Sequence, residues 1–294
     1  MTTISRYIFV GCSALTSVTL PWNGTEENFY DLALYTHCGG TAYVPYFSKA
    51  AYLNIYNDEL YQKVVGYVES TDISELDNAI YVDPFTANVG GVKNIEVKLK
   101  NDVDVTSYGF ELVLPEGMSI ATTSNGSFNS AVTLSGRNSG FQVVTNKLSD
   151  NVYKVAVASL SGASLTDNDG TVLTIRARVA DDADADDTYA VKIQNPLIVE
   201  PSEAKPAVEE TVAEIDMDMI KGDVNGDAVV DLADAVLVIN HYVGKTLTSF
   251  VEKTANVNSD DDIDLADAVR IINYYVGKIS SLSRQTTSGE RDPQ

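Results

Sequence analysis

The sequence predicts a multidomain chain built from a short repeat segment, an all-β sandwich and a small α-helical module. Three observations predict this: an aromatic-rich start with apolar residues at intervals of two and three, a middle part with period-two alternation, and a duplication near the end. They divide the chain into residues 1–72, 76–219 and 220–278. Residues 279–294 form a polar tail that we expect to be disordered.

The composition limits the classes of function. The 294 residues carry a formal net charge of −22, from 42 acidic and 20 basic side chains, which argues against nucleic acid or an anionic membrane as partner. Two cysteines and two histidines are too few for a disulfide framework or a zinc-hydrolase centre. No apolar run approaches the roughly 20 residues of a transmembrane helix, so no membrane span is expected.

The first segment contains a spaced apolar pattern at residues 9–21 and a second stretch of interest at residues 41–52. The pattern resembles bacterial surface leucine-rich repeats on six positions, which are Phe9, Cys12, Leu15, Val18, Leu20 and Pro21. The second stretch resembles the closing cap of such arrays, and the resemblance makes Cys12 a buried thiol. A lipoprotein-type cleavage box at residues 9–12 is the alternative, but the apolar run before it is too short for a signal peptide. We expect a piece of a longer secreted protein.

The middle segment alternates apolar and polar residues in several short runs. The inward residues are expected to be Ile95, Val97, Leu99, Phe110, Leu112, Leu114, Val155, Val157, Leu173, Ile175, Ala177, Val179, Tyr189, Val191 and Ile193. Glycine- and proline-containing turns separate the runs, as in an antiparallel sandwich. Residues 200–221 read either as a linker or, as we prefer, as a final strand over about 211–220 that leads directly into the helical module.

Residues 107–117 and 165–175 resemble a cohesin-type domain. This resemblance implies a jelly-roll-like sandwich that serves as a receptor for docking modules, so a dockerin is one candidate partner of residues 76–219. A carbohydrate-binding module gives a similar pattern and makes a glycan the other candidate partner. That alternative needs exposed aromatic side chains, for which the candidates are Tyr81, Tyr108, Phe110, Phe128, Phe141, Tyr153 and Tyr189.

The last segment contains two copies of one pattern, at residues 222–245 and 255–278, with 15 of 24 positions identical. Calcium takes about six to eight oxygen ligands, which a loop of about 12 residues supplies from positions 1, 3, 5, 7, 9 and 12. The first loop places Asp223, Asn225, Asp227, the carbonyl of Val229, Asp231 and Asp234 there. The second places Asn256, Asn258, Asp260, the carbonyl of Asp262, Asp264 and Asp267 there. The spacing predicts two calcium ions; an acidic helix cap alone is the simpler alternative.

The two loops depart from the usual pattern in ways that affect affinity. Position 6, which favours glycine for a sharp turn, holds Ala228 in the first loop and Asp261 in the second. A non-glycine residue there is expected to cost about 1 kcal/mol. Asn256 is neutral where an aspartate is usual, so we expect the second site to be the weaker. The acidic run at residues 181–187 lacks such spacing and is expected to be a solvated loop.

The duplicated loop–helix pattern closely resembles the dockerin family of type I, whose two loop–helix units are F-hands. The resemblance implies that the segment folds on calcium and docks onto a cohesin domain of another protein. Its recognition positions map to Leu232, Ala233, Leu265 and Ala266, with Leu237 and Arg270 expected to face outward beside them. Val236, Ile239 and Val243, with Val269, Ile272 and Val276, are expected to form the intramolecular core.

Together these features predict a non-catalytic, calcium-dependent assembly protein of a secreted or cell-surface complex that handles polysaccharide. The biological setting is implied by the resemblances alone. The alternatives are a carbohydrate-binding module carried by a dockerin, or an accessory part of a glycoside hydrolase. The sequence contains no Ser/His/Asp order with supporting glycines and no clear carboxylate pair, so no enzyme activity is expected.

Overall fold

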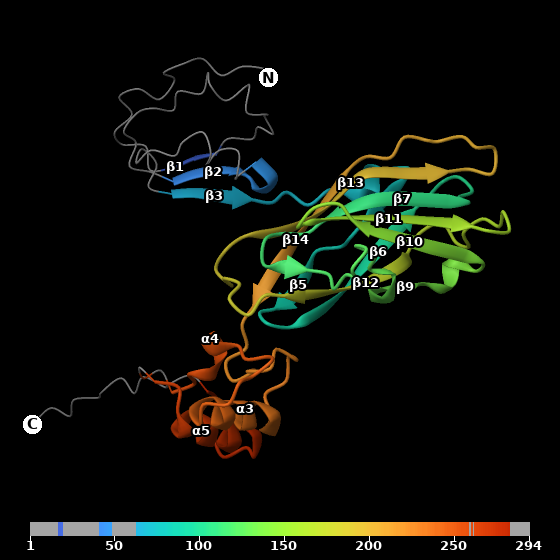
Figure 1. Cartoon of the computed structure of the whole chain (residues 1–294). Helices are drawn as coiled ribbons and strands as arrows, with labels where there is room; N and C mark the ends of the chain where they lie inside the picture. The colour runs from blue at the N-terminus through green and yellow to red at the C-terminus, as the bar shows by residue number, and fades with distance from the viewer. Residues whose placement is uncertain (1–16, 20–40, 49–62, 259, 261, 283–294) are drawn as a thin grey trace, which may run out of the picture.

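The computed structural model describes residues 17–19, 41–48, 63–258, 260 and 262–282 (Figure 1). Most of the first predicted repeat, part of its cap, Asp261 and most of the polar tail therefore lie outside the described residues. In Figure 1 the described chain runs from a small N-terminal sheet, through a β-sandwich, to a helical module at the opposite end of the sandwich.

The N-terminal sheet consists of three parallel strands, β1 (Ser17–Thr19), β2 (Thr41–Pro45) and β3 (Lys63–Tyr67), with the short 3-10 helix η1 (Tyr46–Ser48) after β2. Ser17 pairs with Thr41 and Thr41 pairs with Lys63. Successive strands are thus offset by 24 and 22 residues. Similar offsets of this size between successive parallel strands are typical of stacked repeats.

The sandwich has a six-stranded sheet in the order β10-β11-β7-β13-β14-β5 and a second sheet in the order β4-β6-β12-β8, with β9 also paired to β12. Pairing is antiparallel except between β14 and β5. The strands are β4 (Ala79–Tyr81), β5 (Phe85–Asn88), β6 (Val92–Lys100), β7 (Ser107–Val113), β8 (Met118–Ser119), β9 (Val132–Leu134), β10 (Phe141–Lys147), β11 (Val152–Ser159), β12 (Thr171–Val179), β13 (Tyr189–Val199) and β14 (Thr211–Asp218). Three 3-10 helices accompany them: η2 (Ile73–Glu75), η3 (Asn129–Ala131) and η4 (Gly136–Asn138).

Period-two alternation correctly identified which side of each strand is buried. All fifteen residues expected to point inward are buried and belong to one hydrophobic core between the two sheets. Leu114 lies just beyond the end of β7, and the other fourteen lie within their strands. Because alternate residues of a strand point to opposite faces, their polar neighbours lie on the outside. The predicted final strand is also present, as β14, which pairs with β13 over five residue pairs from Tyr189↔Ile215 to Ile193↔Thr211.

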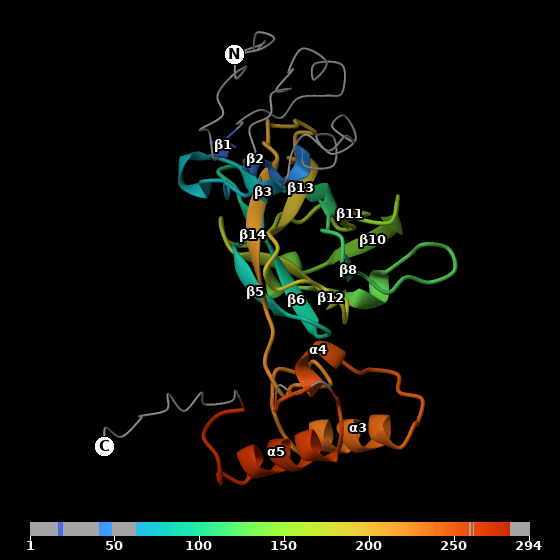
Figure 2. The same ribbon diagram turned by 90° about the vertical axis from the view of Figure 1, so that its left-hand side faces the viewer.

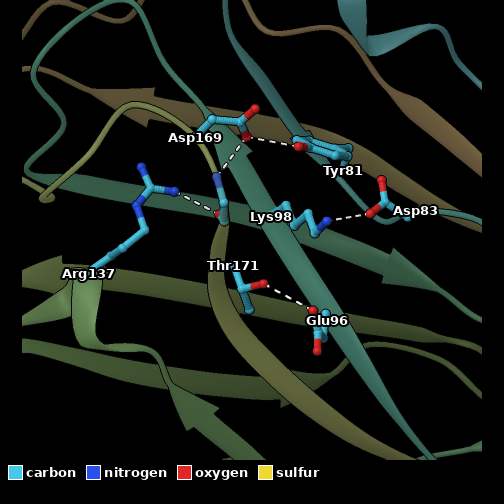
Figure 3. A network of polar contacts seen from close by, with 8 residues as sticks. Tyr81, Asp83, Glu96, Lys98, Arg137, Asp169 and Thr171 are labelled. Atoms are coloured by element: carbon cyan, nitrogen blue, oxygen red, sulfur yellow. Dashed lines mark hydrogen bonds and ion pairs between the residues drawn. The ribbon is translucent and has the colours of Figure 1, made fainter.

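A buried arginine fixes the loops at one end of the second sheet (Figure 3). The guanidinium of Arg137 donates to the carbonyls of Leu99, Thr166, Asp167 and Gly170, and to the side chain of Asn101. Beside it, Tyr81 donates to Asp169, Lys98 pairs with Asp83, and Thr171 donates to Glu96. Each of these three carboxylates thus has a hydrogen-bond partner on a neighbouring strand or loop, which is the arrangement of a structural network.

Candidate functional site

The helical module contains two helices of equal length, α3 (Leu232–Tyr242) and α5 (Leu265–Tyr275), and a single turn, α4 (Glu252–Ala255), between the repeats. Both long helices begin with a capping box. Asp231 accepts from the Ala233 amide at 2.6 Å, while Asp234 accepts from the Asp231 amide at 2.8 Å. In the second copy, Asp264 and Asp267 do the same at 2.6 and 3.0 Å. Such reciprocal bonds satisfy amides that a helix start leaves unpaired.

Two buried carboxylates organise the first loop. Asp223 is only 3% exposed and accepts hydrogen bonds from the amides of Gly226, Asp227 and Ala228 at 2.8 to 3.1 Å. Asp234 is fully buried and accepts from the amides of Val224 and Asn225 at 2.8 and 3.1 Å. The loop therefore winds around the side chains at positions 1 and 12, which brings its two ends together.

The second loop repeats part of this arrangement. Asp267 is fully buried and accepts from the amides of Val257 and Asn258 at 2.8 and 3.1 Å, as Asp234 does in the first loop. Position 1 differs, because the side-chain amide of Asn256 donates to the carbonyl of Asp260. A neutral donor therefore stands where the first loop has a buried carboxylate.

Burial has an electrostatic cost in the first loop. It raises the pKa of Asp223, and the negative charges of Asp234 and Asp227 raise it further. It likewise raises the pKa of Asp234, with Asp227 adding to the effect. In both cases loop amides partly offset the shift. Two carboxylates that are costly to keep charged are suited to a divalent cation, whose charge compensates the loss of water around them.

The remaining predicted ligands lie in the same loops but are engaged in local hydrogen bonds. Asp227 accepts from the Val229 amide and the Asn225 side chain, each at 2.9 Å. Asp260 accepts from the Asp262 amide at 3.1 Å and from the Asn258 side chain at 2.6 Å. Within the described part of the chain, no group of three His, Cys, Asp or Glu side chains is close enough to hold a metal. The fit to calcium therefore depends on the loop geometry and on donors of mixed type, carboxylate, amide and carbonyl, which is the set that calcium uses.

Position 6 of the first loop has the backbone conformation that usually requires glycine. Ala228 has φ = 71°, in the left-handed region, and its side chain is exposed. The expected sharp turn is therefore made by a residue for which this conformation is unfavourable.

The outward faces of the helices differ partly from expectation. Leu232 and Leu265 are 46% and 44% exposed, and Ala233 and Ala266 are also exposed. The assignment of Val236, Val243, Val269 and Val276 to the core was wrong, because each is more than half exposed. The core instead contains Val224, Ala235, Val238, Ala255, Val257, Ala268, Ile271 and Leu282.

Two residues expected to face outward are more enclosed than their neighbours. Leu237 packs partly buried against the core of the module, and Arg270 donates to the Leu282 carbonyl at 3.1 Å. Sequence reasoning missed Val236 and Val269, which follow Leu232 and Leu265 by four residues. This i,i+4 spacing, which places residues on one helix face, was the available signal.

The sandwich carries a separate apolar surface on its six-stranded sheet. Val144, Ala156, Gly109 and Leu197 are successive cross-strand partners on β10, β11, β7 and β13. Val144 is 67% exposed and Leu197 is 40% exposed. These residues line a shallow depression of about 420 Å³. The next row along the sheet is polar, with Asn146, Lys154, Glu111 and Gln194.

The aromatic candidates for glycan binding lie elsewhere. All seven, from Tyr81 to Tyr189, are at most 7% exposed and belong to the buried interior of the sandwich. Flat stacking on a sugar ring requires an accessible aromatic face, so these side chains do not form a platform. No helix in the described part of the chain is long and apolar enough to cross a membrane.

Comparison with known proteins agrees with the duplication. Residues 221–276 match the family model of the dockerin type I domain. No curated protein matches the chain. We refer to residues 221–276 as the dockerin segment.

Solved structures similar to part of the chain are cohesins. They include a non-cellulosomal cohesin from the archaeon Archaeoglobus fulgidus, with 18% identity over 48% of this chain and 91% of that one and a TM-score of 0.37. The sixth cohesin of scaffoldin B from Acetivibrio cellulolyticus, solved with a Cel5 dockerin, has 14% identity over 49% and 100% and a TM-score of 0.39. A type I cohesin–dockerin complex from Clostridium thermocellum has 15% identity over the same shares and the same score.

Proposed function

We propose that the chain is a non-catalytic assembly protein whose dockerin segment binds two calcium ions and docks onto a cohesin domain of another protein. The observation that carries the proposal is the duplicated loop–helix unit, which presents the same apolar side chains twice. We name these the docking faces: Leu232, Ala233 and Val236 on α3, and Leu265, Ala266 and Val269 on α5. Exposed apolar side chains on a rigid helix are suited to burial against a partner.

The calcium part of the proposal follows from the charge of the loops. Asp223, Asp227, Asp231 and Asp234 stand within one 12-position loop, where they repel one another unless a cation is present. Because the ligands come together only in the folded loop, metal binding and folding are coupled. The ligands we assign are those predicted from the spacing, Asp223 to Asp234 and Asn256 to Asp267.

The duplication also predicts how docking occurs. Since Leu232-Ala233-Asp234-Ala235-Val236 is repeated as residues 265–269, either helix offers the same surface. A partner is then able to bind in two orientations related by a half-turn. Either docking face alone is sufficient for binding.

The test is a pull-down and titration calorimetry of the full chain against a panel of type I and type II cohesins, with calcium or with chelator. Leu232→Asp and Leu265→Asp are expected to bind about as well as the unchanged protein, whereas the double variant loses at least about 100-fold. Val243→Asp is the matched control, because Val243 is also an exposed apolar residue but lies beyond the end of α3. Binding that persists in chelator, or in the double variant, would contradict the proposal.

A second function is favoured by the apolar row on the sandwich. We propose that Val144, Ala156, Gly109 and Leu197 form a receptor surface for a docking module of another protein. Small residues at Gly109 and Ala156 leave the sheet open between two exposed apolar side chains, and the polar row beside it supplies a rim. Val144→Glu and Leu197→Glu should abolish capture of dockerins from a panel, and Asn146→Glu, exposed on the same strand, should not.

The N-terminal sheet and the calcium dependence support a proposal for the architecture and location of the protein. The parallel strands β1, β2 and β3, with their offsets of 24 and 22 residues, support a C-terminal piece of a leucine-rich repeat array. Calcium-dependent docking is suited to extracellular calcium concentrations, so we place the chain outside the cell or on its surface, in a complex that handles polysaccharide. Cell fractionation tests this placement. If the native protein is found neither at the cell surface nor in the culture medium, the placement is wrong.

A further inference from the structure

The first calcium loop is in direct contact with the base of the sandwich. Gly90 and Gly91 follow β5, and Gly226 stands at position 4 of the loop. A β-carbon added to Gly91 would lie 2.5 Å from the Gly226 carbonyl oxygen, and one added to Gly226 would lie 2.5 Å from the Gly90 carbonyl oxygen. Real β-carbons do not approach other atoms this closely, so two backbones meet here where no side chain fits.

A residue from the connection between the two repeats fills the end of the sandwich core. Val251 is fully buried and belongs to the hydrophobic core of the sandwich, although it lies between α3 and α4 in sequence. Its Cγ2 atom would lie 2.2 Å from a β-carbon on Gly90. Burial of this apolar side chain away from water stabilises the contact. The dockerin segment thus supplies part of the sandwich's own packing.

Hydrogen bonds link residues 251–254 both to the sandwich and to the first loop. The ammonium of Lys253 donates to the carbonyls of Asp182 and Ala183 in the sandwich, at 3.0 and 3.1 Å. On the loop side, the Val251 amide donates to the Val224 carbonyl at 2.9 Å. The hydroxyl of Thr254 donates to the Asp223 carbonyl at 2.6 Å.

These contacts depend on the shape of the first loop. Val224 and Asp223 provide the carbonyls that hold Val251 and Thr254, and Gly226 stands between the predicted ligands Asn225 and Asp227. The Val224 amide donates to the carboxylate of Asp234, and the Gly226 amide donates to the carboxylate of Asp223. A change that unwinds this loop therefore removes the partner of Val251 and moves Gly226 away from Gly90.

We propose that the first loop, once loaded with calcium, latches the dockerin segment to the base of the sandwich and so fixes the angle at which the docking faces are presented. The latch consists of Gly90, Gly91, Gly226, Val251 and Lys253. In Figures 1 and 2, α4 lies between the sandwich and the two long helices, which are on the far side. The closed latch therefore leaves both docking faces open. This inference depends on the proposed calcium site.

The test uses the full chain, with hydrogen–deuterium exchange of the segments 86–92 and 178–184 and small-angle X-ray scattering, with calcium and with chelator. Chelator is expected to increase exchange in both segments at least about fivefold and to increase the maximum dimension, while exchange in β7 and β11 stays slow. Asp227→Ala, at position 5 of the first loop, should reproduce this in calcium. Asp260→Ala, at position 5 of the second loop, is the matched control and should not.

A variant of the sandwich separates the latch from calcium binding. Gly91→Ala changes no loop residue and should increase exchange at 178–184 while calorimetry still finds two calcium ions bound. The latch alone is wrong if Asp227→Ala and Asp260→Ala increase exchange equally. It is also wrong if calcium binds but its removal leaves exchange in these segments unchanged. Absence of calcium binding to the unchanged chain would overturn the latch and the proposed function together.

Discussion

Replacing Ala228 by glycine should strengthen the first calcium loop. Ala228 has φ = 71°, a left-handed conformation that costs an L-residue with a β-carbon about 1–2 kcal/mol. Its methyl group is exposed, so its loss removes little packing. Glycine lowers the stability of the folded loop by about 0.5–1 kcal/mol, because it has more conformational freedom to lose from the unfolded chain. The net gain is about 0.5–1 kcal/mol, or about two- to fivefold in calcium affinity where binding and folding are coupled.

The assay is calcium titration of the full chain by calorimetry, with helix content followed by circular dichroism. Ala233→Gly is the control, because Ala233 is an exposed alanine within α3, where glycine weakens the helix by up to about 1 kcal/mol. The two substitutions should change the affinity of the first site in opposite directions. If Ala228→Gly weakens calcium binding, or both variants weaken it equally, the argument from backbone strain is wrong.

Four other changes should have measurable effects. Asn256→Asp adds a carboxylate at position 1 and should tighten the second site by about tenfold in calorimetry, whereas Asp223→Asn should weaken the first site by a similar factor. Arg137→Ala removes the guanidinium donor from four sandwich carbonyls and should lower the urea-unfolding free energy of the sandwich by roughly 3–5 kcal/mol. Since burial raises the pKa of Asp223 and Asp234, the metal-free folded module binds protons more tightly than the unfolded chain. In chelator the stability of the module should therefore rise as the pH falls from the raised folded pKa values to about 4, which thermal unfolding at several pH values will measure. Calcium affinity should fall over the same range, which calcium titration at several pH values will measure.

The strands were predictable because one physical rule governs them. Residues such as Phe110, Leu112 and Ile175 alternate with polar ones, and burial of one face of a sheet requires that alternation. Ligand spacing predicts which loop residues surround one ion, and that assignment stays a prediction. Asp223 and Asp234 indeed lie buried at the two ends of the first loop.

The helix faces were harder to predict because α3 and α5 are apolar on more than one side. Val236 and Val238 are two positions apart, yet the first is 53% exposed and the second is fully buried. Periodicity identifies stripes but does not tell which stripe meets the neighbouring helix. The small residues Ala235 and Ala268 turned out to face the core, where two helices approach closely, and their valine neighbours remained outside.

The contact between the sandwich and the helical module was not predicted from the sequence, although one glycine in the sequence indicates it. Gly90 and Gly91 form one of the glycine-containing turns between predicted strands, and Gly90, at φ = 75°, does need glycine for that purpose. Gly91 does not, because its φ is not positive, so the turn alone leaves its identity unexplained. The close approach of the Gly226 carbonyl accounts for it, since any side chain at residue 91 would push the calcium loop away. A glycine that the local conformation does not require is thus the sequence-level sign of a second backbone, and here that backbone belongs to the loop predicted to hold calcium.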